Sequence, residues 1–309
     1  MKSQKWTTND IPNLKGKVII VTGGNSGLGY ESVKAFAEKG AEIILASRSI
    51  EKGEAAKSQI EKGNPSLKII VKQLDLMDLS SIISFSADIK LKYDKLDVLL
   101  NNAGIMMNPY SLTKDGFESQ MGTNHLGHFA LTGLLLDLIK STPGSRVVNV
   151  SSNAHKWGVM DFENLLFEEG KDYTPMKAYG RSKLSNLLFT YQLQRWFDSN
   201  SIDSIAVAAH PGVSMTNLGR HLEDKLMYKL LLPLAGLFTQ SQAYGALPEI
   251  RAAVDPGVKP GEYYGPEGFN QMKGAPTVVQ SNEASHNVDD ARKLWEISEK
   301  LTGVNFSLG

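Results

Sequence analysis

The stretch KVIIVTGGNSGLG at residues 17–29 decides the fold of this chain. Its first half is an apolar, β-branched run typical of a strand buried on both faces, and its second half places glycines at 23, 27 and 29. Helical periodicity follows as far as Gly40, and residues 42–47 have the pattern of a second strand. Strand, glycine turn, helix and strand form a βαβ unit whose helix N-terminus can face a pyrophosphate. A plain glycine turn without a ligand is the alternative interpretation.

Strand and helix patterns alternate along the rest of the chain. We expect helices near residues 51–61, 79–92, 116–140 and 176–197, strands at 68–73, 96–101, 145–151 and 202–209, and then a short strand at 262–264 and an amphipathic helix near 288–302. This order predicts an α/β fold of the Rossmann type, with a doubly wound parallel sheet of about seven strands and helices on both faces. Residues 1–309 are expected to form a single domain, with a polar N-terminal extension at 1–15.

Tyr179 and Lys183 are the most informative pair of side chains in the sequence. If residues 176–197 are helical, the i, i+4 spacing puts both on one face of the helix. A nearby ammonium favours the phenolate, so we expect Lys183 to lower the pKa of Tyr179 toward the working range of a general acid or base. A Tyr-x-x-x-Lys pair on a solvated helix face is the alternative.

Three motifs in order resemble those of the short-chain dehydrogenase/reductase family. They are Thr22-Gly23-x-x-x-Gly27-x-Gly29, Asn101-Asn102-Ala103-Gly104 and Tyr179-x-x-x-Lys183, and Asn124 and Ser152 extend the likeness over nearly the whole chain. The sequence around Asn124 and the long spacing between Ser152 and Tyr179 are most similar to those of retinol-dehydrogenase-type and protochlorophyllide-reductase-type members.

The resemblance implies a set of site residues. The catalytic group is Asn124, Ser152, Tyr179 and Lys183; the cofactor contacts are Gly23, Asn25, Ser26, Gly27, Leu28, Gly29, Ser47, Arg48, Asp75, Leu76, Asn102, Ala103, Gly104, Tyr179, Lys183, Pro211, Gly212, Val213 and Thr216. In the implied chemistry, a nicotinamide exchanges a hydride with a carbonyl or alcohol carbon, and Tyr179 exchanges the proton. Ser152 donates a hydrogen bond to the reacting oxygen, and Lys183 binds the nicotinamide ribose. Asn124 holds a water that relays protons from Lys183 to solvent.

The end of the second predicted strand indicates which nicotinamide cofactor is used. A carboxylate there would bind the ribose 2′-hydroxyl of NAD, whereas this chain has Ser47-Arg48. A guanidinium pairs well with a 2′-phosphate, so we expect NADP(H) to be preferred, with NAD(H) possible. Arg48 as a solvated loop cation, and Asp75 as the cap of the next helix rather than an adenine contact, are the alternatives.

The substrate is expected to be an apolar small molecule that carries a carbonyl or an alcohol. The apolar run at 226–238 lies in a region, about 214–240, where family members place a lid over the substrate, and Trp157, Val159, Met160 and Phe162 are expected to add to its wall. A packing or dimer face is the alternative for the apolar run. It is shorter than the roughly 20 apolar residues of a membrane span, so no transmembrane segment is expected.

Composition narrows the remaining possibilities. Lys plus Arg and Asp plus Glu both number 33, so nothing suggests attraction to nucleic acid, and the absence of cysteine excludes disulfides. We expect a cytoplasmic protein, since residues 1–15 do not resemble a signal peptide. His125 and His128 have no evident third ligand, so no metal is expected.

The resemblance implies a homodimer or homotetramer assembled through the long helices, including the one that bears Tyr179. The rival functions are a non-catalytic NADPH sensor or scaffold, and an extended-type sugar-nucleotide epimerase or dehydratase.

Overall fold

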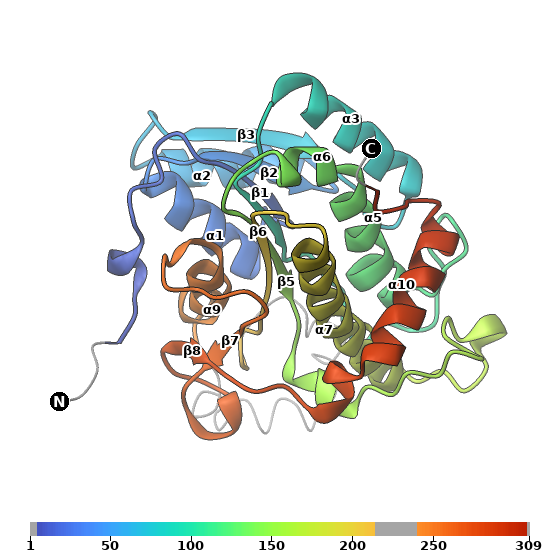
Figure 1. Ribbon diagram of the computed structural model, residues 1–309. Helices are drawn as coiled ribbons and strands as arrows, with labels where there is room; N and C mark the ends of the chain where they lie inside the picture. The colour runs from blue at the N-terminus through green and yellow to red at the C-terminus, as the bar shows by residue number, and fades with distance from the viewer. Residues whose placement is uncertain (1–4, 214–239, 308–309) are drawn as a thin grey trace, which may run out of the picture.

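An eight-stranded sheet forms the centre of the protein, and its strand order is β3-β2-β1-β4-β5-β6-β7-β8 (Figure 1). A computed structural model describes residues 5–213 and 240–307. The strands are β1 (Val18–Thr22), β2 (Glu42–Ser47), β3 (Lys68–Gln73), β4 (Val98–Asn101), β5 (Ser145–Val150), β6 (Ser204–Ala209), β7 (Tyr263–Pro266) and β8 (Pro276–Val278). Strands β1 to β7 pair in parallel, which confirms the predicted doubly wound α/β fold.

The sheet has one strand more than the sequence suggested, because the chain turns back after β7. Strand β8 pairs antiparallel with β7, from Tyr264↔Val278 to Pro266↔Pro276. Proline has no backbone N–H to donate to a neighbouring strand, so a short strand that begins with Pro276 suits the edge of the sheet.

Helices cover both faces of the sheet, as Figure 1 shows. One face carries α1 (Gly27–Glu38), α2 (Ile50–Glu61) and α9 (Gln242–Val254), whereas the other carries α3 (Leu79–Lys92), α5 (Gly127–Leu134), α6 (Leu136–Lys140), α7 (Pro175–Ser199) and α10 (Val288–Thr302). Short turns of helix are η1 (Thr8–Asp10), α4 (Ser119–Met121), η2 (Gly122–Leu126), η3 (Asn153–Trp157), η4 (Glu168–Gly170), η6 (Phe269–Gln271) and η7 (Glu283–His286). The helix expected at 116–140 is thus divided, and η2 is its π-helical part.

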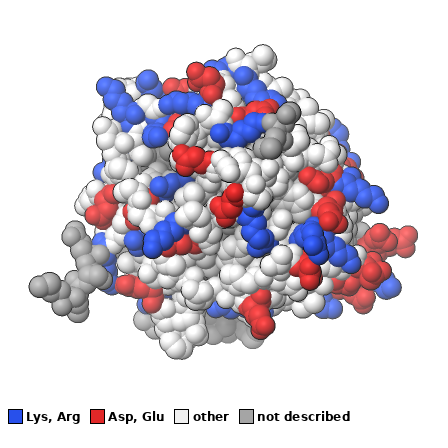
Figure 2. All heavy atoms as spheres, in the orientation of Figure 1, with Lys and Arg blue, Asp and Glu red and all other residues white. Residues whose placement is uncertain are grey.

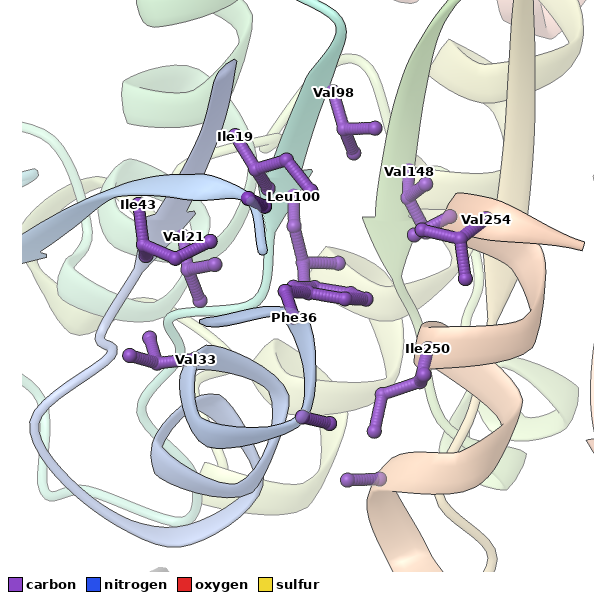
Figure 3. Close-up of a cluster of buried hydrophobic side chains, with 14 of the residues drawn as sticks. Ile19, Val21, Val33, Phe36, Ile43, Val98, Leu100, Val148, Ile250 and Val254 are labelled. Atoms are coloured by element: carbon purple, nitrogen blue, oxygen red, sulfur yellow. The ribbon is translucent and has the colours of Figure 1, made fainter. Parts of the chain in front are cut away.

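The two cores explain the apolar run that opens the sheet. Ile19 and Val21 of β1 face α1 and α9, where Phe36 and Ile250 pack against them (Figure 3). Ile20 between them points into the opposite core beneath α5 and α7. Side chains of a strand alternate between faces, so a strand covered on both sides must be apolar throughout. The N-terminal extension, expected to be polar, also contributes to the core, because Ile11 and Leu14 are buried in the same cluster as Ile19 and Phe36.

The face of the protein that Figure 2 shows carries charges of both signs. Figure 2 shows lysine and arginine interspersed with aspartate and glutamate over the visible face, in line with the zero net charge. Within residues 5–213 and 240–307, no helix combines the length and apolar content that crossing a membrane requires.

Candidate active site

The glycine turn at the end of β1 has a backbone that only glycine adopts easily. Gly23 and Gly27 have positive φ angles of 67° and 60°. A Cβ on Gly29 would lie 2.5 Å from both the carbonyl oxygen of Gly23 and the Nδ2 of Asn102, so this position admits no side chain. Ser26 caps α1 without a side-chain hydrogen bond. Backbone N–H groups of the first turn therefore remain available to an anion.

A cleft of about 780 Å³ runs along the carboxyl ends of the strands. Its lining includes many of the predicted cofactor residues: Gly23, Asn25, Ser26, Gly27, Leu28, Arg48, Asp75, Leu76, Asn102, Ala103, Gly104, Tyr179, Lys183 and Pro211. Thr216 and most of the expected lid at 214–240 lie outside the described residues. A cleft that joins the glycine turn to Tyr179 and Lys183 fits an elongated dinucleotide.

The far end of the cleft contains two cations, one of which sequence reasoning missed. Arg48 and Lys52 both line it, together with Gln59 of α2. Lys52 lies within the first turn of α2, four residues beyond Arg48, and that spacing was the signal available in the sequence. Ser47 does not line the cleft; its hydroxyl donates to Asn25 Oδ1 over 3.1 Å and so ties the glycine turn to the end of β2.

Asp75 is free of the capping role that was its alternative. Asp78 caps α3 by accepting from the N–H groups of Ser80 and Ser81, while Asp75 Oδ1 accepts from the Met77 N–H over 3.0 Å. Asp75 and Leu76 both lie at the cleft wall, where the sequence predicted an adenine contact.

The pair on α7 reaches the cleft, but its electrostatics differ from the expectation. Burial raises the pKa of Tyr179, with the Ser152 hydroxyl acting in the opposite direction. Lys183 Nζ lies 5.8 Å from the centre of the Tyr179 ring and donates to the Val150 carbonyl over 2.9 Å. Burial also lowers the pKa of Lys183 to about 8. The predicted lowering of the Tyr179 pKa is therefore wrong for this arrangement, because desolvation of the buried phenol is the largest influence on that pKa and the hydrogen bond with Ser152 opposes it only in part.

Asn124 lies in the π-helical turn η2 and connects three segments. Its Oδ1 accepts from the Ile105 N–H over 2.9 Å, and its Nδ2 donates to the Ile105 carbonyl and to the Ser182 hydroxyl. The side chain thus joins the loop after β4 to the residue that precedes Lys183. A π-helical turn at such a position is often a functional feature. Ser152 caps η3 through its Oγ, which accepts from the Ala154 N–H.

The loop after β6 is held by segments far along the chain. Gly212 has φ 66°, and a Cβ there would lie 2.3 Å from the Met272 carbonyl oxygen. The Val213 N–H donates to that same carbonyl over 2.8 Å, while the Val213 carbonyl accepts from Gln240. Any contact between the Val213 backbone and a carboxamide must replace or add to these bonds, and it stays a prediction.

The insert before Tyr179 differs from the predicted substrate wall. Met160 and Phe162 pack against a third buried cluster that includes Leu184 and Leu294, on the side of α7 that faces α10. Trp157 and Val159 are exposed and line a separate hollow beside Arg181. Apolar character alone could not separate these two environments.

His125 of η2 and His128 of α5, which follows η2 directly, point in different directions. His125 contacts Ser298 of α10 over 2.9 Å, whereas His128 contacts Thr22 of β1 over 2.9 Å. In the described part of the chain, no three His, Cys, Asp or Glu side chains gather into a group that could hold a metal ion.

Comparison with known proteins identifies the class. The model of the short chain dehydrogenase family matches residues 17–164, and the chain belongs to the short-chain dehydrogenase/reductase family, whose members bind NAD(P). It is therefore an oxidoreductase of alcohols and carbonyls.

Within the family it is similar to the retinol dehydrogenases. It is 37% identical to retinol dehydrogenase 12 of Mus musculus, over 97% of this chain and 90% of that protein. It is 39% identical to retinol dehydrogenase 11 of Homo sapiens, over 94% and 87%. An uncharacterized protein from Mycobacterium paratuberculosis has a crystal structure with a TM-score of 0.82 and 38% identity, covering 99% of this chain and 100% of that one.

Proposed function

We propose that this protein is an NADP(H)-dependent oxidoreductase that interconverts a carbonyl and an alcohol on an apolar small molecule. The observation that carries the proposal is one continuous cleft with Arg48 and Lys52 at one end and Tyr179 and Lys183 at the other. Two cations at the adenosine end favour a nucleotide with a 2′-phosphate over one with a free hydroxyl. The bound nicotinamide supplies or accepts the hydride in this chemistry.

Tyr179 is the proposed proton donor and acceptor for the substrate oxygen. The phenol is protonated at neutral pH, which is the form that a general acid needs in carbonyl reduction, and the positive charge of a bound oxidised nicotinamide would oppose the rise in its pKa that burial causes. Ser152 lies close enough to influence that pKa and would stabilise negative charge on the same oxygen. Lys183 would hold the nicotinamide ribose, and Asn124 would keep the Lys183 segment in register through Ser182.

An apolar substrate is supported by the similarity to retinol dehydrogenases and by the apolar residues near the catalytic pair. Ile105 and Met106 line the cleft on the side of Tyr179 and Lys183. The region 214–240 is the proposed lid. A single domain over 1–309 and a cytoplasmic location remain predictions.

The proposed homodimer or homotetramer would need a surface other than the one first expected. Helix α10 already packs along α7, where Ala291 and Leu294 contact Leu184 and Leu188. Most of α7 is buried within one chain as a result. We therefore propose that any assembly leaves the helix of Tyr179 inside the subunit.

The test is an assay of NADPH and NADH oxidation over aldehydes, ketones and quinones graded in size and polarity. We expect turnover with NADPH that rises with the apolar surface of the substrate. A protein that binds NADPH and reduces no member of the panel would support the sensor function instead. Epimerisation of a sugar nucleotide would support the extended-type alternative.

A further inference from the structure

The buried imidazole of His128 bridges two parts of the site that the sequence treats separately. It lies in α5 and is only 2% exposed. Its Nε2 is 2.9 Å from the Thr22 hydroxyl, and its Nδ1 is 3.1 Å from the Asn124 carbonyl oxygen. Thr22 ends β1 immediately before the glycine turn, and Asn124 holds the segment beside Lys183.

The partners of the ring fix its tautomer. A carbonyl oxygen can only accept, so Nδ1 carries the proton and donates it to Asn124. Burial lowers the pKa of His128 to about 4, so the ring is neutral and Nε2 accepts from the Thr22 hydroxyl. The Thr22 oxygen in turn accepts from the Ala103 N–H over 2.9 Å. The longer contact from Thr22 to the Leu100 carbonyl, 3.3 Å, would leave Nε2 without a donor.

From this chain of bonds we infer that His128 is a positioning residue, which couples the cofactor turn at Thr22 and Ala103 to the Asn124 and Lys183 side of the site. The inference rests on the proposed function. The coupled parts lie close together, since a Cβ on Gly104 would meet Asn124 Oδ1 at 3.2 Å and Lys183 Nζ at 3.4 Å. A small shift of the turn after β4 therefore reaches the catalytic lysine directly.

Two substitutions separate the two ends of the ring. In His128→Asn the amide takes the place of Nδ1, keeps a donor for Asn124 and loses Thr22. In His128→Gln the amide takes the place of Nε2, keeps an acceptor for Thr22 and loses Asn124. We expect His128→Asn to weaken NADPH binding about tenfold with kcat nearly kept, and His128→Gln to lower kcat about tenfold with NADPH affinity nearly kept, as for one buried hydrogen bond.

His125 supplies the matched control because it is equally buried, lies in the adjoining turn η2 and faces away from the cleft. It contacts Ser298 and the rings of Phe129 and Phe189. His125→Gln should lower thermal stability and leave both NADPH affinity and kcat nearly unchanged. If both His128 variants instead lose affinity and kcat in the same proportion, or behave like His125→Gln, His128 is only a packing residue and the inference fails.

A second measurement covers the case in which a His128 variant does not fold. Thr22→Val removes the donor to Nε2, whereas Thr22→Ser keeps it, so only the valine should weaken NADPH binding. Where His128→Asn does fold, the double variant Thr22→Val, His128→Asn should bind NADPH no more weakly than Thr22→Val alone. Additive losses would overturn the coupling. NADPH affinity is measured by fluorescence without a substrate, so this arm stands even if no carbonyl in the panel is reduced.

Discussion

The cofactor end and the substrate end of the cleft differ in how many of the residues expected there from the sequence lie at the cleft. At the cofactor end, the glycine turn, Arg48, Asp75 and the Asn102 turn all line one cleft. At the substrate end, where the nicotinamide is also expected, the Val213 backbone is already bonded to Met272 and Gln240, and Met160 packs away from the cleft. A site formed by the local backbone of one segment can therefore be predicted from sequence, whereas a site formed by segments far apart in the chain cannot.

The largest expected effect that sharpens this comparison is at the substrate end. Tyr179→Phe removes the phenol that we propose to exchange a proton with the substrate, while the ring still fills its buried site. We expect kcat to fall by about 100 to 10,000-fold, as for the loss of a general acid, with NADPH binding nearly unchanged. Steady-state rates and NADPH fluorescence measure the two quantities.

Tyr191 provides the control for that substitution. It lies on the same helix, is also buried, and its hydroxyl contacts Ser281 rather than the cleft. Tyr191→Phe should keep a nearly normal rate. Near-normal turnover in Tyr179→Phe would move the proton donor elsewhere and break the proposed chemistry.

A smaller effect is expected at the cofactor end. Arg48→Ala should weaken NADPH binding by about 10 to 100-fold, as for loss of a charge-assisted hydrogen bond, and should weaken NADH binding far less. Lys52→Ala should act in the same direction with a smaller loss, because the flexible ammonium binds phosphate through a single point charge. Isothermal titration with each nucleotide measures both.

Lys57 is the matched control because it lies on α2 and does not line the cleft. Lys57→Ala should leave the ratio of NADPH to NADH affinity unchanged. Equal losses for both nucleotides in Arg48→Ala would refute the assignment of the 2′-phosphate to this end of the cleft.

Contacts between residues close together in the chain could be predicted from the sequence, whereas contacts between residues far apart could not. The requirement for Gly29 follows from Gly23 a few residues away, so the motif alone indicates the close approach. The bond between Thr22 and His128 spans 106 residues, and the packing of α10 on α7 joins the C-terminal part of the chain to the catalytic helix. The Tyr179 pKa was predicted in the wrong direction because spacing gives the neighbour but not the degree of burial. Desolvation is set by the whole fold.

A separate effect, on stability rather than on binding or rate, is expected at a buried carboxyl that no motif indicated. Glu249 of α9 accepts from the Ser32 hydroxyl of α1 over 2.7 Å, and burial raises its pKa to about 8. Between the ordinary pKa of about 4.5 and 8, the unfolded chain releases this proton and the folded protein keeps it, so stability contributed by Glu249 is lost as pH rises through that window. One group changes the unfolding free energy by at most about 1.4 kcal/mol per pH unit. Glu249→Gln keeps an acceptor for Ser32 and has no proton to lose. The unfolding free energy, measured with denaturant at pH 5, 6 and 7, should therefore fall less with rising pH in the variant than in the wild type. If it has the same pH dependence in both proteins, Glu249 is ionised in the folded protein and the prediction fails.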